Sequence, residues 1–444
     1  MGCPMTHKRY PRYKESGVAW IGNVPEQWEV KRLRHIATFT NSNVDKNAHD
    51  DQVVVSLCNY TDVYYNEFIT ADMPFMQATA SHSEIEQFSL KKGDVIITKD
   101  SEDPSDIGIP SLVIQEAPCV VCGYHLTMIR TADINTSRLL HRILQSHPTK
   151  AHFFVEAPGI TRYGLSQDAI GDLRFCLPPS GDRGAIADSL DRETSRIDAL
   201  IAKKTHFIEL LKEKLQALIT HAVTKGLDPK VKLRDSGVEW IGEVPEHWLA
   251  MKFNHVAHVT EGLVDPKEQP YRDMVLVAPN HIESGTGRIL ELETASDQNA
   301  ESGKYTCKQG AVIYSKIRPA LAKVAIAPCD CLCSADMYPM DCTDRTYPEW
   351  LFYLMLSPPF TSWAILESDR VAMPKINRES LAGLRVFVPP IDEQMAVVNW
   401  LKTQLEKVDQ ISSRTQRSID LLKERRSALI TATVTGQIDL RDAS

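Results

Sequence analysis

The sequence predicts a mixed α/β (α+β) fold written as a tandem repeat of two halves, each a globular body followed by one long helix. Three observations predict it. A 25-residue motif occurs twice, each body contains short β-branched runs bounded by turn residues, and two amphipathic stretches of more than 40 residues lack proline. At 444 residues the chain is also too long for a single domain of ordinary size.

The composition is that of a globular protein, with 43% hydrophobic and 24% charged residues. Lys and Arg number 50 against 58 Asp and Glu, for a formal charge of −8, so any DNA binding must be local or shared with a partner. No apolar run reaches the ~20 residues of a membrane span, and the N-terminus has no hydrophobic signal-peptide core. Ten cysteines are too few for a disulfide scaffold, which predicts reduced thiols and a cytoplasmic location.

The motif that opens each half is the clearest sign of duplication. Residues 13–37 and 233–257 are identical at twelve of 25 positions without a gap, and both contain Ser-Gly-Val-x-Trp-Ile-Gly-x-Val-Pro-Glu-x-Trp. Two tryptophans and a proline at one spacing indicate a repeat. We expect the four tryptophans to be packing anchors where each body meets its helix: Trp20, Trp28, Trp240 and Trp248.

The end of each half repeats as well, whereas the middle does not. Residues 173–228 align with 384–439 at a constant offset of 211, and Leu-Leu-Lys-Glu recurs at 210–213 and 421–424. The intervening first body (38–170) and second body (258–381) differ most. The shared ends should therefore do the same job twice, while the two bodies do two versions of one job.

Each body mixes predicted strands and helices. Short β-branched runs between Gly, Asp or Pro predict strands at 53–55, 95–97, 120–121 and 312–314. Helices are predicted at 137–145 and 348–356. Pro178-Pro179 and Pro389-Pro390 end the bodies, because proline lacks the backbone donor and biases its neighbour away from the helix.

The stretch from Asp182 to Thr224 predicts one long helix, and Asp392 to Thr433 predicts its copy. Apolar residues recur at alternating steps of four and three. An amphipathic helix packed on its own globule would show the same pattern, but ~43 residues at 1.5 Å give ~65 Å, longer than a 150-residue globule. We therefore predict that the two helices form an antiparallel coiled-coil rod with pseudo-two-fold symmetry. Its candidate interface residues are Ile197, Ile201, Ile208, Leu211, Leu215, Leu218, Val408, Ile419, Leu422 and Leu429.

With these motifs in view, the chain resembles the specificity subunit of Type I restriction–modification systems over nearly its whole length. The resemblance rests on the repeated Trp-Ile-Gly motif, on Gly93-Asp94-Val95 with Thr98 to Glu102, on Ser315 to Pro319, and on Pro389 to Gln394. One departure is the head of the first helix, Pro178 to Arg183, which lacks the Glu-Gln pair of the second.

The resemblance implies a division of the chain into four segments. Residues 13–180 and 227–390 would be target recognition domains, each reading one half of a bipartite, asymmetric sequence in double-stranded DNA. Residues 181–226 and 391–434 would be conserved helices that dock two methyltransferase subunits, with restriction–translocase subunits attached to that core. S-adenosylmethionine, ATP and Mg would serve the partner subunits, so this chain needs no cofactor and contacts no membrane.

Loops at matching positions in the two bodies are the best DNA-binding candidates. Basic, hydroxyl and aromatic side chains there suit base edges or phosphates. The candidates are Lys99, Ser101, Arg162 and Tyr163 in the first body, and Lys316, Arg318, Arg370, Lys375 and Asn377 in the second, with Arg378 beside them.

Three catalytic or metal-binding patterns are better explained structurally. Ser357-Pro358-Pro359-Phe360 resembles an amino-methyltransferase tetrapeptide but follows a predicted helix. Asp94 with Lys99 could suggest a nuclease, but the second copy has Ala311 in place of the aspartate. Cys119 and Cys122, like the alternating Cys329, Cys331 and Cys333, read as buried strand residues rather than zinc ligands. We therefore predict no catalytic residue and no metal site.

The sequence thus predicts a non-catalytic DNA-recognition subunit. The alternative from another class is a protein-interaction scaffold that does not bind DNA and whose two bodies bind peptides or proteins on a coiled coil.

Overall fold

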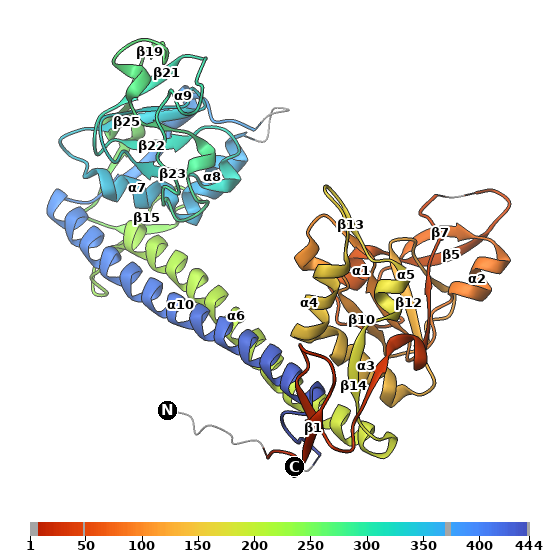
Figure 1. The fold of residues 1–444 in the computed structure, drawn as a ribbon. Helices are drawn as coiled ribbons and strands as arrows, with labels where there is room; N and C mark the ends of the chain where they lie inside the picture. The colour runs from red at the N-terminus through yellow and green to blue at the C-terminus, as the bar shows by residue number, and fades with distance from the viewer. Residues whose placement is uncertain (1–7, 48, 369–373, 442–444) are drawn as a thin grey trace. The chain divides into compact units, whose positions relative to one another are not determined.

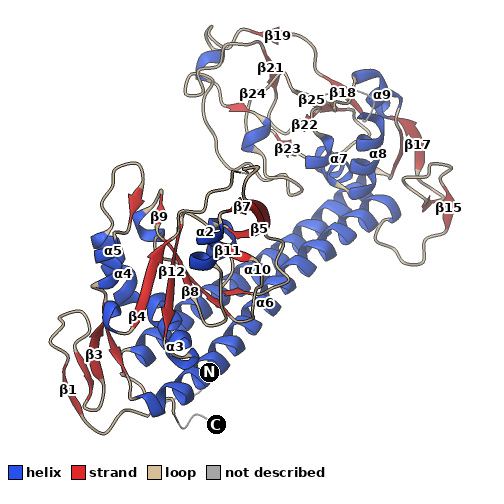
Figure 2. Cartoon of the chain, turned by 90° about the vertical axis from the view of Figure 1, so that its right-hand side faces the viewer, coloured by secondary structure: helices blue, strands red, loops and turns tan. Residues whose placement is uncertain are grey.

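A computed structural model describes residues 8–47, 49–368 and 374–441 (Figure 1). The chain forms two compact units. Unit 1 comprises residues 1–204 and 417–444, and unit 2 comprises 205–416, so each long helix contributes one part to either unit. Among the described residues, no helix is long and apolar enough to cross a membrane. Helix and strand are mixed in both units, as predicted (Figure 2).

The first body in unit 1 is built on two sheets. The larger has the strand order β4-β12-β8-β10-β6, and the smaller places β11 and β7 on either side of β5. The strands are β4 (Ala37–Asn41), β5 (Val53–Cys58), β6 (Phe68–Ile69), β7 (Met76–Ala80), β8 (Val95–Thr98), β10 (Pro110–Val113), β11 (Val120–Cys122) and β12 (Leu126–Thr131). All four residues of β8 are buried, as a central β-branched strand requires.

Short helices cover the first body. They are α1 (Tyr60–Tyr64), α2 (His82–Phe88), α3 (Ile134–Gln145), α4 (His147–Glu156) and α5 (Gln167–Gly171). Helix α3 begins where the Asp133 side chain accepts a hydrogen bond from the Thr136 N–H, 2.9 Å away. It ends at Ser146, whose hydroxyl donates to the Ile143 carbonyl at 2.6 Å.

The second body repeats this plan. Its main sheet has the order β18-β25-β22-β23, matching β4-β12-β8-β10, and the parallel pair β20·β24 matches β5·β11. The strands are β18 (Ala257–Val259), β19 (Leu263–Val264), β20 (Leu276–Val277), β21 (Lys304–Cys307), β22 (Val312–Ser315), β23 (Val324–Ile326), β24 (Cys331–Cys333) and β25 (Met337–Cys342). The helices are α7 (Pro348–Leu356), α8 (Pro358–Ser368) and α9 (Arg378–Gly383). The strands predicted at 53–55, 95–97, 120–121 and 312–314 and the two predicted helices are confirmed.

The repeated motif forms the same small structure in both units. Hairpin β1 (Tyr13–Glu15)–β2 (Asn23–Pro25) matches β15 (Leu233–Asp235)–β16 (Glu243–Pro245). Strand β3 (Glu29–Arg32) pairs with β14 (Arg174–Leu177), as β17 (Leu249–Lys252) pairs with β26 (Arg385–Val388).

The motif tryptophans do not all have the predicted role. Trp28 and Trp248 are each 1% exposed and are packing anchors, as predicted. The prediction is wrong for Trp20, which is 52% exposed. Trp20 lies in the turn between β1 and β2, where its ring stacks on the His152 ring at the surface rather than entering the core.

The helices α6 (Ser180–Lys225) and α10 (Ile391–Val434) are continuous and pack antiparallel within each unit. In unit 1 the Arg426 Nε lies 2.8 Å from an Asp198 oxygen, and Arg441 reaches back to Asp182 at 2.9 Å. In unit 2 Ile208 and Leu215 line one pocket with Val408 and Ser412. Of the ten candidate interface residues, Ile197, Leu211, Ile419 and Leu429 are buried, and the other six are half-buried.

The apolar face of α6 widens at its C-terminal end. There Ile219, Ala222 and Val223 are almost fully buried and join the core of the second body. Apolar residues at steps of three and four predict the face that contacts the partner helix. They do not predict this wider face, because α6 contacts both α10 and the second body at this end.

Both long helices end on a glycine against a motif tryptophan. Gly226 and Gly436 have φ values of +74° and +72°, a conformation that glycine adopts without strain. A Cβ added at Gly436 would lie 2.2 Å from the Pro25 ring and one added at Gly226 would lie 2.8 Å from a Glu393 oxygen, while a Trp ring lies 3.5 Å away in both cases. The end of each helix therefore meets an equivalent hairpin.

The heads of the two helices are fixed by different side chains. Gln394 is fully buried; its Oε1 accepts the Tyr347 N–H at 2.7 Å and its Nε2 donates to the Pro389 carbonyl at 2.8 Å. At the matching position Arg183 donates to the Pro178 carbonyl at 3.1 Å. Although the first helix lacks the Glu-Gln pair, Arg183 fixes its head to the preceding backbone much as Gln394 fixes the head of the second helix.

Candidate nucleic-acid interface

Four candidate DNA-binding residues of the first body meet where strand β8 ends. The chain continues from Lys99 into β9 (Asp100–Ser101), which pairs with β13 (Tyr163–Gly164) in a two-stranded ribbon, so Ser101 lies opposite Tyr163. The Lys99 backbone fixes the ribbon, since its N–H donates to the His125 carbonyl at 3.0 Å and its carbonyl accepts the Leu165 N–H at 2.8 Å. A two-stranded ribbon is narrow enough to enter the major groove of DNA.

The side chains at this ribbon are held in place by one another. Arg162, whose side chain is 55% exposed, donates to an Asp100 oxygen at 2.7 Å, and both Asp100 oxygens lie 2.9 Å from the His125 Nδ1. The Asp100 carboxylate raises the pKa of Arg162 above its ordinary value. The Lys99 ammonium lies 5.1 Å from the centre of the Tyr124 ring. The cationic groups are therefore oriented before any ligand arrives.

A pocket of about 470 Å³ adjoins this cluster. Its lining offers amide groups and aromatic faces, which hydrogen-bond to and stack on nucleic-acid bases. The lining residues include Asn43, Asn47, Asn59, Tyr60, Tyr124 and His125. These residues were not among the sequence-based candidates, although the aromatic residues Tyr60, Tyr64 and Tyr65 give a signal at this position.

The second body presents its candidates on the same backbone frame. The Lys316 N–H donates to the Asp336 carbonyl at 3.0 Å and its carbonyl accepts the Ile376 N–H at 2.9 Å, which reproduces the bonds of Lys99. Ile317 forms a bridge with Lys375 where the first body has its ribbon. The structure thus brings Lys316, Arg318 and Lys375 together.

The side chains on this frame differ from those of the first body. Arg318 is exposed and its φ is 49°, and its guanidinium has no hydrogen bond or ion pair with a described residue. The Lys316 ammonium donates to the Ala335 carbonyl at 2.7 Å and lies 5.4 Å from the centre of the Tyr338 ring. Arg378 faces the Tyr338 ring at 5.5 Å and donates to the Tyr305 hydroxyl at 3.1 Å.

The two remaining candidates, Asn377 and Arg370, are not placed as free DNA-binding side chains. The Asn377 side-chain oxygen caps α9 by accepting the Ser380 N–H at 2.7 Å, so that oxygen already serves the fold. Arg370 lies outside the described residues.

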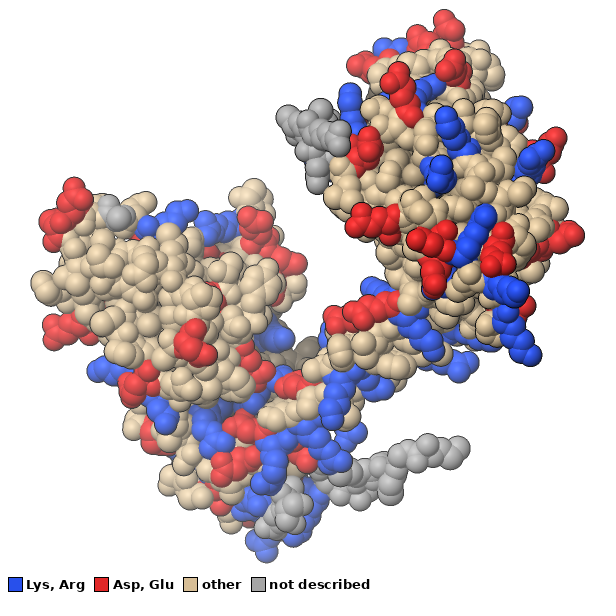
Figure 3. Space-filling view, turned by 180° about the vertical axis from the view of Figure 1, so that it is seen from behind, with Lys and Arg blue, Asp and Glu red and all other residues tan. Residues whose placement is uncertain are grey.

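Acidic and basic side chains are interspersed on both bodies in the face drawn in Figure 3. No continuous patch of Lys and Arg covers either body on that face. The net charge of −8 likewise favours DNA contact through local groups such as Arg162 and Arg318.

The residues that suggested a nuclease, a methyltransferase or a zinc site have structural roles in the described part of the chain. Asp94 is 1% exposed and forms an ion pair with Arg130 at 2.7 Å, so it joins strands β8 and β12. Ser357 ends α7 by donating to the Leu354 carbonyl at 2.7 Å, as Ser146 ends α3. Cys122 of β11 and Cys331 and Cys333 of β24 are buried strand residues, as predicted. The prediction is wrong for Cys119, which is exposed, and for Cys329, which is half-buried, because both lie in the turns that precede these strands. No group of three His, Cys, Asp or Glu that could hold a metal occurs in the part of the chain that the structure describes.

Comparison with curated proteins shows what the chain is related to. It is 24% identical over 432 residues to the Type I restriction enzyme EcoDI specificity subunit of Escherichia coli, covering 94% of this chain and 90% of that protein. The chain resembles type I specificity subunits over 94% of its length. It is also 21% identical over 437 residues to the MjaVIII specificity subunit of Methanocaldococcus jannaschii, covering 94% and 95% of the two chains. The predicted resemblance to this family is confirmed, although no family profile matches the chain.

Two solved structures share the fold. A chain from a structure describing the assembly and conformational transition of a type I R-M system matches with a TM-score of 0.67 at 13% identity, over 93% of this chain and 98% of that one. The HsdS subunit of Thermoanaerobacter tengcongensis matches with a TM-score of 0.50, also at 13% identity, over 94% and 98%.

Proposed function

We propose that this chain is the DNA sequence-recognition subunit of a Type I restriction–modification complex. Each body reads one half of a bipartite, asymmetric target in double-stranded DNA. The chain itself is non-catalytic. It directs adenine methylation and restriction by partner subunits, which bind S-adenosylmethionine, ATP and Mg. The relatives named as specificity subunits support this role. The cytoplasmic location stays a prediction.

One structural observation carries the proposal. The two bodies hold the residue after the central strand, Lys99 or Lys316, on the same backbone bonds, yet surround it with different side chains. Arg162 is paired with Asp100 in the first body, whereas the Arg318 side chain is unpaired among the described residues of the second. A common frame with different polar groups is what reading two different half-sites requires.

The rod is part of the same proposal. We propose that α6 and α10 form one antiparallel coiled coil between two target recognition domains, with the domain boundaries predicted from the sequence. The antiparallel packing in each unit supports it. Exposed apolar side chains on the helices, including Leu200, Phe207, Leu210, Ile411 and Leu421, suit contact with two methyltransferase subunits and the restriction subunits.

The test is reconstitution with the methyltransferase subunits that the source cell encodes. A recognition subunit will co-purify with them, protect one DNA sequence, and direct methylation to a bipartite site found by methylation mapping. A protein-interaction scaffold will show no sequence-dependent protection, and methylation will not depend on its presence.

Arg318→Ala should relax a single position of the second half-site if the guanidinium contacts a base, at a cost of about 1–3 kcal/mol. If the contact is to phosphate, binding should weaken evenly across sequences and its salt dependence should become shallower. Binding to variant sites at several salt concentrations separates the two cases. Arg345→Ala, at another exposed arginine of unit 2, is the control. Unchanged binding by the Arg318 variant would remove this residue from the interface.

A further inference from the structure

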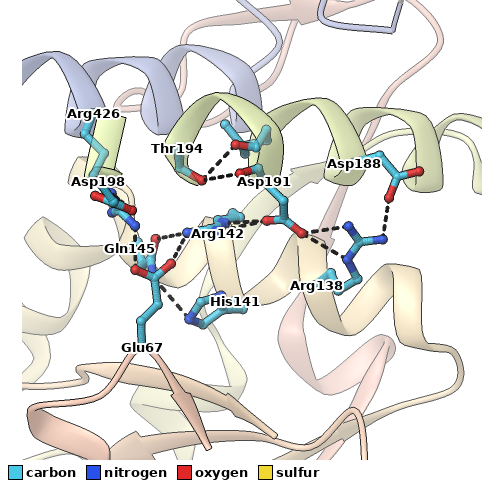
Figure 4. Close-up of polar contacts among 11 residues, drawn as sticks. Glu67, Arg138, His141, Arg142, Gln145, Asp188, Asp191, Thr194, Asp198 and Arg426 are labelled. Atoms are coloured by element: carbon cyan, nitrogen blue, oxygen red, sulfur yellow. Dashed lines mark hydrogen bonds and ion pairs between the residues drawn. The ribbon is translucent and has the colours of Figure 1, made fainter. Parts of the chain in front are cut away.

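A network of charged side chains joins the first body to both long helices within unit 1 (Figure 4). Arg138 and Arg142 of α3 point toward α6, where the Asp191 carboxylate accepts hydrogen bonds from both. The Arg138 Nη2 lies 2.7 Å from one Asp191 oxygen, and the Arg142 Nη2 lies 2.8 Å from the other. Only 2% of the Arg142 side chain is exposed, so its charge depends on these partners.

Glu67 extends the network to the other helix. One of its oxygens binds Arg142, and the other binds Arg426 of α10, which also pairs with Asp198 of α6. Burial would raise the pKa of Glu67, but the facing Arg142 and Arg426 guanidinium groups outweigh it and hold that pKa below its ordinary value. Arg138 also pairs with Asp188 of α6, at 2.7 Å. The first body is therefore matched by charge to Asp188 and Asp191 of α6 and to Arg426 of α10.

The second body docks on its helix head at the same positions with the opposite sign. Ser146 and Ser357 end α3 and α7 with the same hydroxyl-to-carbonyl bond, and they lie 211 residues apart, the offset at which residues 173–228 align with 384–439. At this offset Arg138 corresponds to Glu349, and Asp191 corresponds to Lys402. The Lys402 Nζ lies 2.7 Å and 2.8 Å from the two Glu349 oxygens.

The rest of the network is absent at the matching positions. Tyr353 corresponds to Arg142, and Leu215 of α6 corresponds to Arg426 of α10. Tyr353 is buried, and Leu215 packs against the core of the second body. The docking face of the first body is therefore positively charged and that of the second body is negatively charged. The head of each long helix carries the opposite charge, Asp191 in α6 and Lys402 in α10.

We propose that these opposite-signed contacts are a matching code between each body and its helix head, which decides which bodies the chain accepts at each of its two positions. The code is read at two points, the head residue (Asp191 or Lys402) and the partner-helix residue (Arg426 or Leu215).

The proposal follows from the cost of a mismatch. A copy of the first body at the second position would place two arginines, one of them buried, against Lys402. Its Glu67 would face Leu215 instead of an arginine. Like charges at contact distance and a buried charge without its partner are both strongly unfavourable. The mirror-image error would set Glu349 against Asp191.

Charge reversal in the full chain tests the second pair. Lys402→Asp and Glu349→Arg should each lower the unfolding midpoint of unit 2 by about 2–4 °C, because the pair is partly exposed. The double variant, which copies the signs of unit 1, should regain most of that loss. A loss in the double variant equal to the sum of the two single losses would overturn the code at this pair.

Body duplication tests the code as a whole. In the full chain, residues 258–381 are replaced by a copy of 38–170, with and without Lys402→Asp and Leu215→Arg, which restore both matching residues. The unmatched chain should lose about 10 °C in the unfolding midpoint of unit 2, and the matched chain should recover it. The control carries Lys407→Asp and Leu210→Arg, the same changes at exposed sites of the same helices.

Recovery in the matched chain alone supports the code. Equal recovery in the control, or none in either chain, overturns it. Calorimetry and limited proteolysis provide these readouts without DNA, so the result does not depend on the proposed recognition function.

Discussion

Exchange of residues 258–381 for the body of a related specificity subunit is expected to replace the second half of the methylated sequence and leave the first half and the gap unchanged. The reason is that both bodies stand on equivalent frames, and the candidate base-reading groups of the second body, Lys316, Arg318 and Lys375, all lie within the exchanged residues. The donor should carry an acidic residue that faces Lys402, as Glu349 does.

Methylation mapping of the reconstituted complex measures this change directly. The reciprocal exchange of 38–170 is the control and should alter only the first half. Insertion of residues into the linker between Lys225 and Lys232, or into the helices, should instead change the gap, because helix length sets separation at about 1.5 Å per residue. An exchange that altered both halves, or neither, would contradict independent reading by the two bodies.

Unit 1 is expected to lose more stability than unit 2 on mild acidification. Burial, with a contribution from the adjacent Arg142, lowers the pKa of His141 to about 3 in the folded chain. Arg426 acts in the same direction, and Glu67 and Asp191 oppose it. The Gln145 amide nitrogen lies 3.1 Å from the His141 Nε2, so that ring nitrogen accepts a hydrogen bond and the ring is neutral.

The sign of the effect follows from proton binding. Below pH 6.5 the unfolded chain protonates this histidine and the folded chain does not, so acid favours unfolding. The loss is about 1.4 kcal/mol per pH unit, or about 2 kcal/mol by pH 5. Glu67, whose pKa is lowered, adds a further loss only as the pH falls below the ~4.3 of an unfolded glutamate.

Calorimetry at pH 7 and pH 5 measures this difference. The unit 1 midpoint should fall by several degrees more than that of unit 2, where Phe352 occupies the position of His141. His141→Phe is the matched control and should remove the excess shift. An equal shift in the parent and this variant would show that His141 is not the cause.

Local pattern was sufficient for the elements themselves. β-branched runs between turn residues predicted β8 and β22, and the proline-free stretches predicted α6 and α10 nearly to their ends. The motif predicted that Trp28 and Trp248 are anchors but could not distinguish them from the exposed Trp20, because burial of a side chain in a turn depends on what packs over it.

The candidate interface was predicted in part. Lys99, Ser101, Arg162 and Tyr163 were identified as loop residues, but their convergence on one ribbon depends on a pairing over some 60 residues of chain. Tyr124 and His125 were missed because nothing in their local sequence indicates that they face Asp100 and Lys99. Backbone pairing at long range, which a single sequence does not encode as a pattern, decided the site.

The sequence by itself determined the duplication, the mixed fold, the two long helices and the resemblance to specificity subunits. These depend on identities repeated at fixed offsets and on periodicity along the chain. Only the tertiary structure decided that Arg138 faces Asp191 while Glu349 faces Lys402, and that Arg426 completes the first network while Leu215 packs at the matching place in the second. Charges a few residues apart look alike along the chain, and their pairing is set by which helix faces pack together, since the free energy of a buried charge depends on the partner within hydrogen-bond distance.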